Sequence, residues 1–144
     1  MSTEPASRPV IRTQAELERL WESAVPAPAD GEHRLWLLRI DPDRRAVPRI
    51  VEITGTVDPP EPHDEMTAGL VTLLRCFVED EPSASIAALH SRPGRGVRRE
   101  DREWAHLLHA AAARADARME VVHLMTDAGV LPLPLDEIGV RTTA

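Results

Sequence analysis

Apolar side chains recur at helical spacing in three segments of the chain, and each segment has one apolar face. The first segment, residues 13–25, opens with Thr13 and Glu16 in the arrangement of a capping box, which predicts the start of a helix. The second segment covers residues 65–79, and the third, which is rich in alanine, covers residues 100–118. We therefore expect three amphipathic helices.

Five shorter segments have the composition of β-strands. Residues 33–40 are apolar on both faces, as in a central strand, and a short turn joins them to residues 49–54 in a predicted hairpin. Residues 84–90 and 119–126 follow the second and third helices, and residues 130–135, limited by proline, are typical of an edge strand. The order helix-strand-strand-helix-strand-helix-strand-strand predicts a three-layer α/β fold, in which helices flank a mixed sheet.

The length of 144 residues suits one domain with one core. We expect this domain at residues 13–138, after a flexible N-terminus at 1–12 and before a tail at 139–144. The single cysteine, Cys76, excludes an internal disulfide and a multi-cysteine zinc site. The chain has no apolar run near the roughly 20 residues of a membrane span and no signal-peptide core at its start, so we expect a cytoplasmic protein without a membrane partner.

Charge and aromatic content narrow the classes of partner. The chain has 17 basic residues, all arginine, against 24 acidic ones, which gives a formal net charge of −7. A surface this acidic disfavours nonspecific binding of nucleic acid over the whole molecule. With three tryptophans, one phenylalanine and no tyrosine, a platform for stacking single-stranded bases is not expected either.

The most informative stretch is His90-Ser91-Arg92-Pro93-Gly94, where a predicted strand ends and a loop leads into the long third helix. Side chains at the end of a strand, next to the start of a helix, are where sites usually form in α/β folds. Asp101 lies in the first turn of that helix, and Glu52 lies on the second predicted strand.

This arrangement resembles the JAB/MPN (JAMM) superfamily of metallopeptidase-like domains, whose fold is cytidine-deaminase-like, and in particular its RadC-like bacterial members. The family pattern has an upstream Glu, then His-x-His-Pro at a strand end, then Ser-x-x-Asp at a helix start. Here Glu52, His90, Pro93 and Asp101 stand in that order. The resemblance implies that His90 and Asp101 are metal ligands and that Glu52 is the general base that activates a metal-bound water.

Two departures from the family pattern concern the metal ligands. Arg92 stands where the second histidine belongs, and a guanidinium has no lone pair to give to a metal. The usual spacing puts Glu103 at the aspartate position, whereas a loop two residues shorter puts Asp101 there. At ~100° per residue, Asp101 lies about 60° from the centre of the inward face and Glu103 about 100° from it, which favours Asp101.

The ligand set decides between two interpretations of the resemblance. A catalytic zinc normally has three protein ligands and an open position, and here His90 and Asp101 supply two. We therefore expect a catalytically inactive pseudo-metallopeptidase that binds no cofactor and acts as a binding or scaffold module for a protein partner. The alternative is an active zinc metalloprotease or isopeptidase with a non-standard ligand set that recruits His123.

A third function, from another class, comes from the loop after the third predicted strand. Five arginines fall within eleven residues of an otherwise acidic chain, ahead of a helix N-terminus, and they form a candidate anion-binding set. They are Arg92, Arg95, Arg98, Arg99 and Arg102. This arginine loop predicts binding of nucleic acid or phosphate, against the simpler interpretation of a solvated basic loop neutralised by nearby acids.

Other chemistry-bearing residues have structural explanations. His106 and His109 are three residues apart but are expected on the outer face of the third helix, as a solvated pair. Cys76, beside the apolar face of the second helix, is expected to be a half-buried, inert thiol. The first helix is expected to pack on the sheet or to form a homodimer contact.

Overall fold

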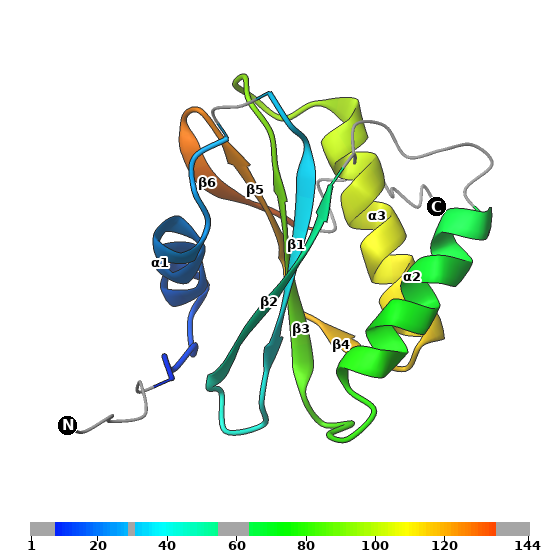
Figure 1. Ribbon diagram of the computed structural model, residues 1–144. Helices are drawn as coiled ribbons and strands as arrows, with labels where there is room; N and C mark the ends of the chain where they lie inside the picture. Colours follow the sequence, from blue (N-terminus) through cyan, green and yellow to red (C-terminus); the bar gives the residue numbers. More distant parts are fainter. Residues whose placement is uncertain (1–7, 29–30, 55–63, 135–144) are drawn as a thin grey trace, which may run out of the picture.

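One mixed β-sheet forms the centre of the protein, and helices cover both of its faces (Figure 1). The structure is a computed structural model that describes residues 8–28, 31–54 and 64–134. The helices are α1 (Gln14–Ala24), α2 (Asp64–Phe77) and α3 (Arg99–Arg114). The strands are β1 (Arg34–Ile40), β2 (Ala46–Thr54), β3 (Ser85–Ser91), β4 (Arg118–Met119), β5 (Val122–Thr126) and β6 (Gly129–Leu133).

The strands stand in the order β2-β1-β3-β5-β6, and β4 pairs with the start of β3 beside β5. β1 is antiparallel to both β2 and β3, β3 is parallel to β5, and β5 and β6 form an antiparallel hairpin. β3 is buried along its whole length because it lies at the centre of the sheet and is covered on both faces. The predicted α/β class with a mixed sheet between helices is confirmed, while the JAB/MPN arrangement itself stays a prediction.

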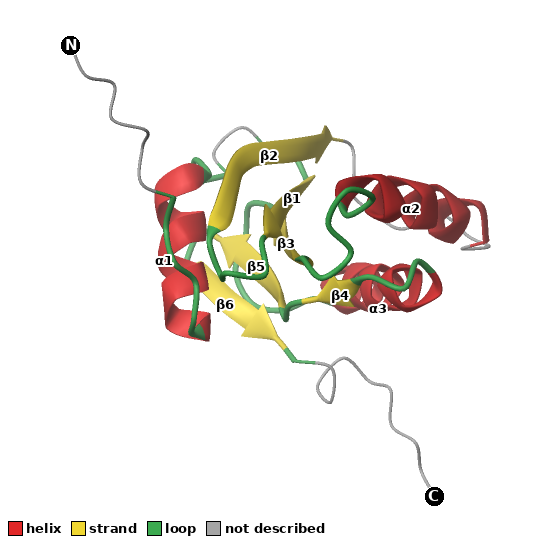
Figure 2. Cartoon of the chain, turned by 90° about the horizontal axis from the view of Figure 1, so that it is seen from below, coloured by secondary structure: helices red, strands yellow, loops and turns green. Residues whose placement is uncertain are grey.

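Of the helices in the described residues, α1 covers one face of the sheet (Figure 2). Thr13 and Glu16 form the predicted capping box, which starts the helix by satisfying free backbone N–H groups. Leu17 and the fully buried Trp21 then face Leu38 and Leu89 of the sheet in one apolar cluster. The first helix is therefore part of the core in this chain.

α2 and α3 lie together on the opposite face and cover the larger core. The apolar face of α3 includes Trp104 and Leu108, which pack with Leu35 and Leu37 of β1 and with Ile86 of β3. These side chains alternate along each strand with those that contact α1, as the two-residue period of a strand requires. Each face of the central strands thus belongs to a different core cluster.

The end of the third helix and the strand segment that follows it differ from the sequence prediction. The third helix ends at Arg114, four residues early, and the chain then turns with Asp116 in a left-handed conformation (φ 59°). The predicted strand at 119–126 is split into β4 and β5. At the break, the Glu120 amide donates to the Ile86 carbonyl (2.8 Å), while its carboxylate accepts from Ser85 Oγ (2.7 Å).

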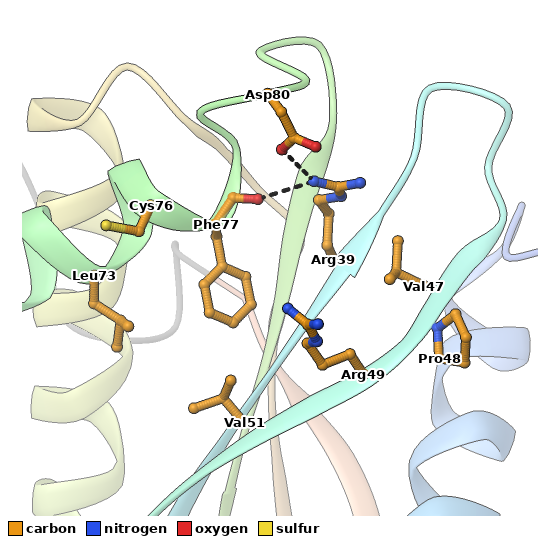
Figure 3. Close-up of a pocket in the computed structure, with 9 residues that line it drawn as sticks. All are labelled: Arg39, Val47, Pro48, Arg49, Val51, Leu73, Cys76, Phe77 and Asp80. Atoms are coloured by element: carbon orange, nitrogen blue, oxygen red, sulfur yellow. Dashed lines mark hydrogen bonds and ion pairs between the residues drawn. The ribbon is translucent and has the colours of Figure 1, made fainter.

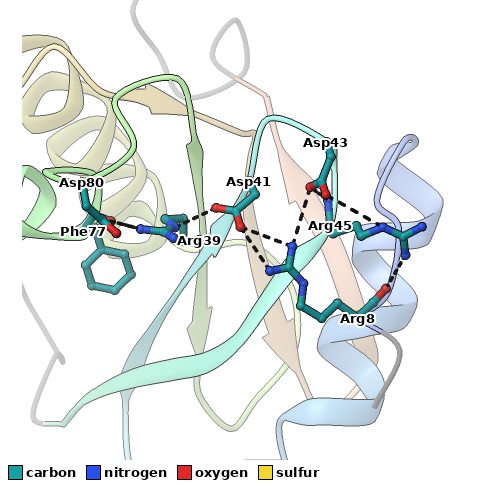
Figure 4. A network of polar contacts seen from close by, with 7 residues as sticks. All are labelled: Arg8, Arg39, Asp41, Asp43, Arg45, Phe77 and Asp80. Carbon is teal, nitrogen blue, oxygen red and sulfur yellow. Dashed lines mark hydrogen bonds and ion pairs between the residues drawn. The ribbon is translucent and has the colours of Figure 1, made fainter. Parts of the chain in front are cut away.

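Residues 8–12, the described part of the predicted flexible N-terminus, contact the rest of the chain, and Figure 4 shows the contacts of Arg8. Ile11 is buried in the core beside α1, and its amide donates to the Arg44 carbonyl (2.7 Å). Arg8 donates to Asp41 Oδ2 (3.2 Å), and Asp41 also accepts from Arg39 (2.9 Å). The predicted tail at 139–144 and the end of the predicted domain lie outside the described residues.

In the part of the chain that the structure describes, no helix is both long enough and apolar enough to cross a membrane.

Candidate functional site

Three of the predicted site residues meet where β3 leads into α3. His90 is the sixth residue of β3, Arg92 directly follows the strand, and Asp101 lies in the first turn of α3. All three side chains are fully buried. Asp101 Oδ1 lies 3.0 Å from His90 Nδ1 and 2.9 Å from Arg92 Nε, and Asp101 Oδ2 lies 2.6 Å from Arg92 Nη2. The helical-period prediction that Asp101, rather than Glu103, faces His90 is confirmed.

Three groups contact the Asp101 carboxylate and keep it ionised. Besides Arg92 and His90, the Arg98 backbone N–H donates to Oδ2 (2.7 Å), so Asp101 also caps α3. Burial by itself raises the pKa of Asp101, but the hydrogen bonds with Arg92, His90 and the Arg98 amide outweigh it and hold that pKa far below its usual range. Both oxygens of the carboxylate are therefore engaged inside the protein.

Arg92 uses its remaining N–H groups to close the loop behind it. Nη1 donates to the Pro93 carbonyl (2.9 Å), and Nη2 donates to the Gly96 carbonyl (2.5 Å) as well as to Asp101. The hydrogen bond to Asp101 is the main reason that the pKa of Arg92 lies above its ordinary value. A buried guanidinium in a bidentate pair with a carboxylate has a structural role, because its donors are no longer available to bind another anion.

Two aromatic rings flank His90. The His33 ring centroid lies 5.8 Å away and the Trp104 centroid 6.5 Å away, both rings tilted by 53°. His33 is half-buried, and its burial, together with the nearby Arg92 guanidinium, lowers its pKa. His33 was not among the predicted site residues, because its approach to His90 depends on the β1–β3 register, which pairs Leu35 with His90.

The cluster does not fit a catalytic metal. Of the predicted ligands, Asp101 has both oxygens bound to the Arg92 guanidinium, whose positive charge occupies the position next to His90. Within residues 8–28, 31–54 and 64–134, His, Cys, Asp and Glu side chains form no group of three that could hold an ion. A zinc ion here would need Arg92 to leave a buried ion pair, and it would gain no third ligand in return.

Glu52 does not join this cluster. It pairs across the sheet with Trp36, and paired residues project from the same face. Trp36 packs with the α1-side cluster, whereas His90 is on the α3 side with Trp104. The Glu52 carboxylate instead lies 2.7 Å from Arg34 Nε at the surface. The structure therefore does not bring Glu52 and His90 together.

His123, the residue that the active-enzyme alternative would recruit, also lies on the α1 face. It pairs with Leu89, next to His90 but projecting from the other side of the sheet. Its Nδ1 lies 3.1 Å from the Val121 carbonyl oxygen, and its Nε2 lies 3.2 Å from Glu18 of α1. Burial lowers the pKa of His123. The sheet therefore separates His123 from Asp101.

The arginine loop divides into one buried and four exposed members. Arg92 is excluded from the predicted anion-binding set by its burial, while Arg95, Arg98, Arg99 and Arg102 are exposed. The loop is held at its tip, where the Gly94 amide donates to Asp127 Oδ2 (2.9 Å). Gly94 has a φ of 98°, and a Cβ there would collide with the Arg98 guanidinium.

The remaining predicted residues are placed as follows. His106 is exposed, as expected, but His109 is half-buried, and burial lowers its pKa. Cys76 is exposed rather than half-buried. It lines a cavity beside β2 that the sequence analysis did not predict (Figure 3).

In comparisons with known proteins, no protein-family model and no curated protein matches the chain.

Proposed function

We propose that this chain is a non-catalytic binding module related to RadC-like JAB/MPN domains, in which an arginine has replaced the catalytic metal. The observation that carries the proposal is the buried contact of Arg92 with both oxygens of Asp101. In the family pattern, the residues at the positions of His90, Arg92 and Asp101 hold the metal. Here the permanent positive charge of Arg92 neutralises the Asp101 carboxylate.

The physical consequence is a domain whose former metal site stabilises the fold. A guanidinium supplies positive charge to Asp101 without an open coordination position, so no water can be activated there. The positions of Glu52 and His123 support the same conclusion, because both project from the opposite face of the sheet. The partner that such a module would bind is a protein, as in the sequence prediction.

The test measures zinc retention and peptidase activity together. The wild-type chain, incubated with ZnCl₂ and then desalted, is expected to retain no stoichiometric zinc by inductively coupled plasma mass spectrometry and to cleave no peptide or isopeptide substrate. Arg92→His, which supplies an imidazole and releases Asp101, is expected to raise the retained zinc towards one ion per chain. One zinc per wild-type chain, lost in His90→Ala, would overturn the proposal.

The four exposed arginines favour a second candidate, the binding of nucleic acid or phosphate. Within the described residues, one ion pair involves these four side chains: Arg99 Nη1 lies 3.7 Å from Glu103 Oε2 on the surface. We expect single-stranded DNA to bind with an affinity that falls steeply with salt, and Arg95→Gln with Arg98→Gln to reduce both the affinity and the salt dependence. An affinity that responds to neither change removes this candidate.

A further inference from the structure

A cavity of about 620 Å³ lies between β2 and the C-terminal end of α2 (Figure 3). It is at the end of the sheet opposite to the His90 cluster, because β1 begins beside His90 and ends beside this cavity. Its size is within the range of pockets that hold small molecules.

A β-bulge in β2 forms one wall of the cavity. The register pairs Leu38 with Ile50 and Ile40 with Ala46, so that residues 47–49 of β2 stand opposite Arg39 alone. Bulges re-aim side chains and recur beside binding sites. Here the bulge directs Arg49 into the space above Val51 and Phe77.

The floor of the cavity is apolar. Val51 of β2 and Leu73 and Phe77 of α2 line it, and all three pack against the larger core while remaining partly exposed. Phe77 is the chain's one phenylalanine. This floor is a hydrophobic surface for a ligand, and the packed core behind it holds its side chains in place.

Two arginines lie at the cavity in different electrostatic states. Arg39 is balanced, since it donates to Asp41 (2.9 Å), to Asp80 (2.8 Å) and to the Phe77 carbonyl (3.3 Å). Arg49 is exposed and has no ion pair with any residue in the described part of the chain. The cavity therefore combines an apolar floor with one uncompensated positive charge.

We infer that this cavity binds a small amphipathic anion, an apolar body that carries one carboxylate or phosphate group. The apolar body would cover Val51, Leu73 and Phe77, and the anionic group would accept hydrogen bonds from Arg49. This site is independent of the proposed function, because it shares no residue with the His90 cluster or the arginine loop.

The cysteine at the rim supplies a local readout. Cys76 is exposed and lines the cavity, so a bound ligand should slow its alkylation by iodoacetamide, followed by mass spectrometry of the intact chain. The probes are octanoate, octanamide and octylamine, which share an apolar body and differ in charge. Octanoate is expected to protect Cys76 in a saturable way, at concentrations at least tenfold lower than either other probe.

Two variants connect that protection to Arg49. Arg49→Gln is expected to raise the half-protecting concentration of octanoate about tenfold, to near that of octanamide. Arg95→Gln removes an equal charge from the arginine loop and should leave protection unchanged. Absence of saturable protection, equal protection by octanamide, or unchanged protection in Arg49→Gln would each overturn the inference.

Discussion

Arg92 decides the chemistry of the cluster at the end of β3. In the proposed relation to JAB/MPN domains, Arg92 takes the position of a metal-binding histidine. Its own charge lies in a fully buried position. Such a charge is tolerated because Asp101 and two backbone carbonyls receive its N–H groups. Because of the same contacts, the buried Asp101 carboxylate depends on Arg92 for its counter-charge.

Removing that partner leaves a buried carboxylate without its counter-charge. We expect Arg92→Met to lower the free energy of unfolding by about 3–5 kcal/mol, measured by urea denaturation. The double variant Arg92→Met with Asp101→Leu should recover much of that loss, since it removes both charges. The exposed Arg95→Met serves as control and should stay within about 0.5 kcal/mol of wild type. A loss in Arg92→Met as small as in Arg95→Met would contradict this account.

At the scale of elements, a polar contact joins α1 to the sheet beside their apolar interface. The Glu18 carboxylate reaches Nε2 of His123 on β5 (3.2 Å), while Nδ1 faces the Val121 carbonyl (3.1 Å). A neutral imidazole carries one N–H and cannot donate to both acceptors, whereas an imidazolium can. Burial nevertheless keeps the pKa of His123 below its ordinary value, with Glu18 opposing the shift.

This contact predicts a dependence of stability on pH. The unfolded chain takes up a proton at His123 near its ordinary pKa of 6.5, but the folded chain resists it. The free energy of unfolding should therefore be largest above about pH 6.5 and decrease as the pH falls below it. In urea titrations from pH 8 to pH 5, His123→Gln should flatten this dependence, and Glu18→Gln should steepen it.

The exposed His106 gives a matched control, since His106→Gln should leave the slope unchanged. His33 and His109, whose pKa values burial also lowers, account for the slope that remains in His123→Gln. A slope unaffected by His123→Gln would show that folding does not lower the pKa of His123, and it would contradict the prediction.

At the scale of the whole molecule, the sheet carries different chemistry at its two ends. At one end, β3 and α3 enclose a neutralised cluster and present exposed arginines. At the other end, a cavity with an apolar floor lies between β2 and α2. Beside it, Arg8 forms an ion pair with Asp41 in the turn after β1. The two ends can be changed independently, because substitutions at separated sites without shared partners act nearly additively.

Local patterns predicted most of the elements and one important contact. Helical periodicity and the capping box predicted α1, and the angular position of Asp101 on α3 predicted that it turns towards His90. These features depend on neighbours within a few residues, which a single sequence contains. The class of the fold follows from the order of such elements.

The pairing of strands that are distant in the sequence determined which residues lie on the same face of the sheet. Alternation along a strand shows which residues share a face, but the register with other strands assigns that face to a particular core. For this reason the family resemblance could group Glu52 with His90, and the active-enzyme alternative could recruit His123, although both residues lie on the opposite side of the sheet. The bulge that directs Arg49 into its cavity exists likewise only in the pairing of β1 with β2, where three residues face one.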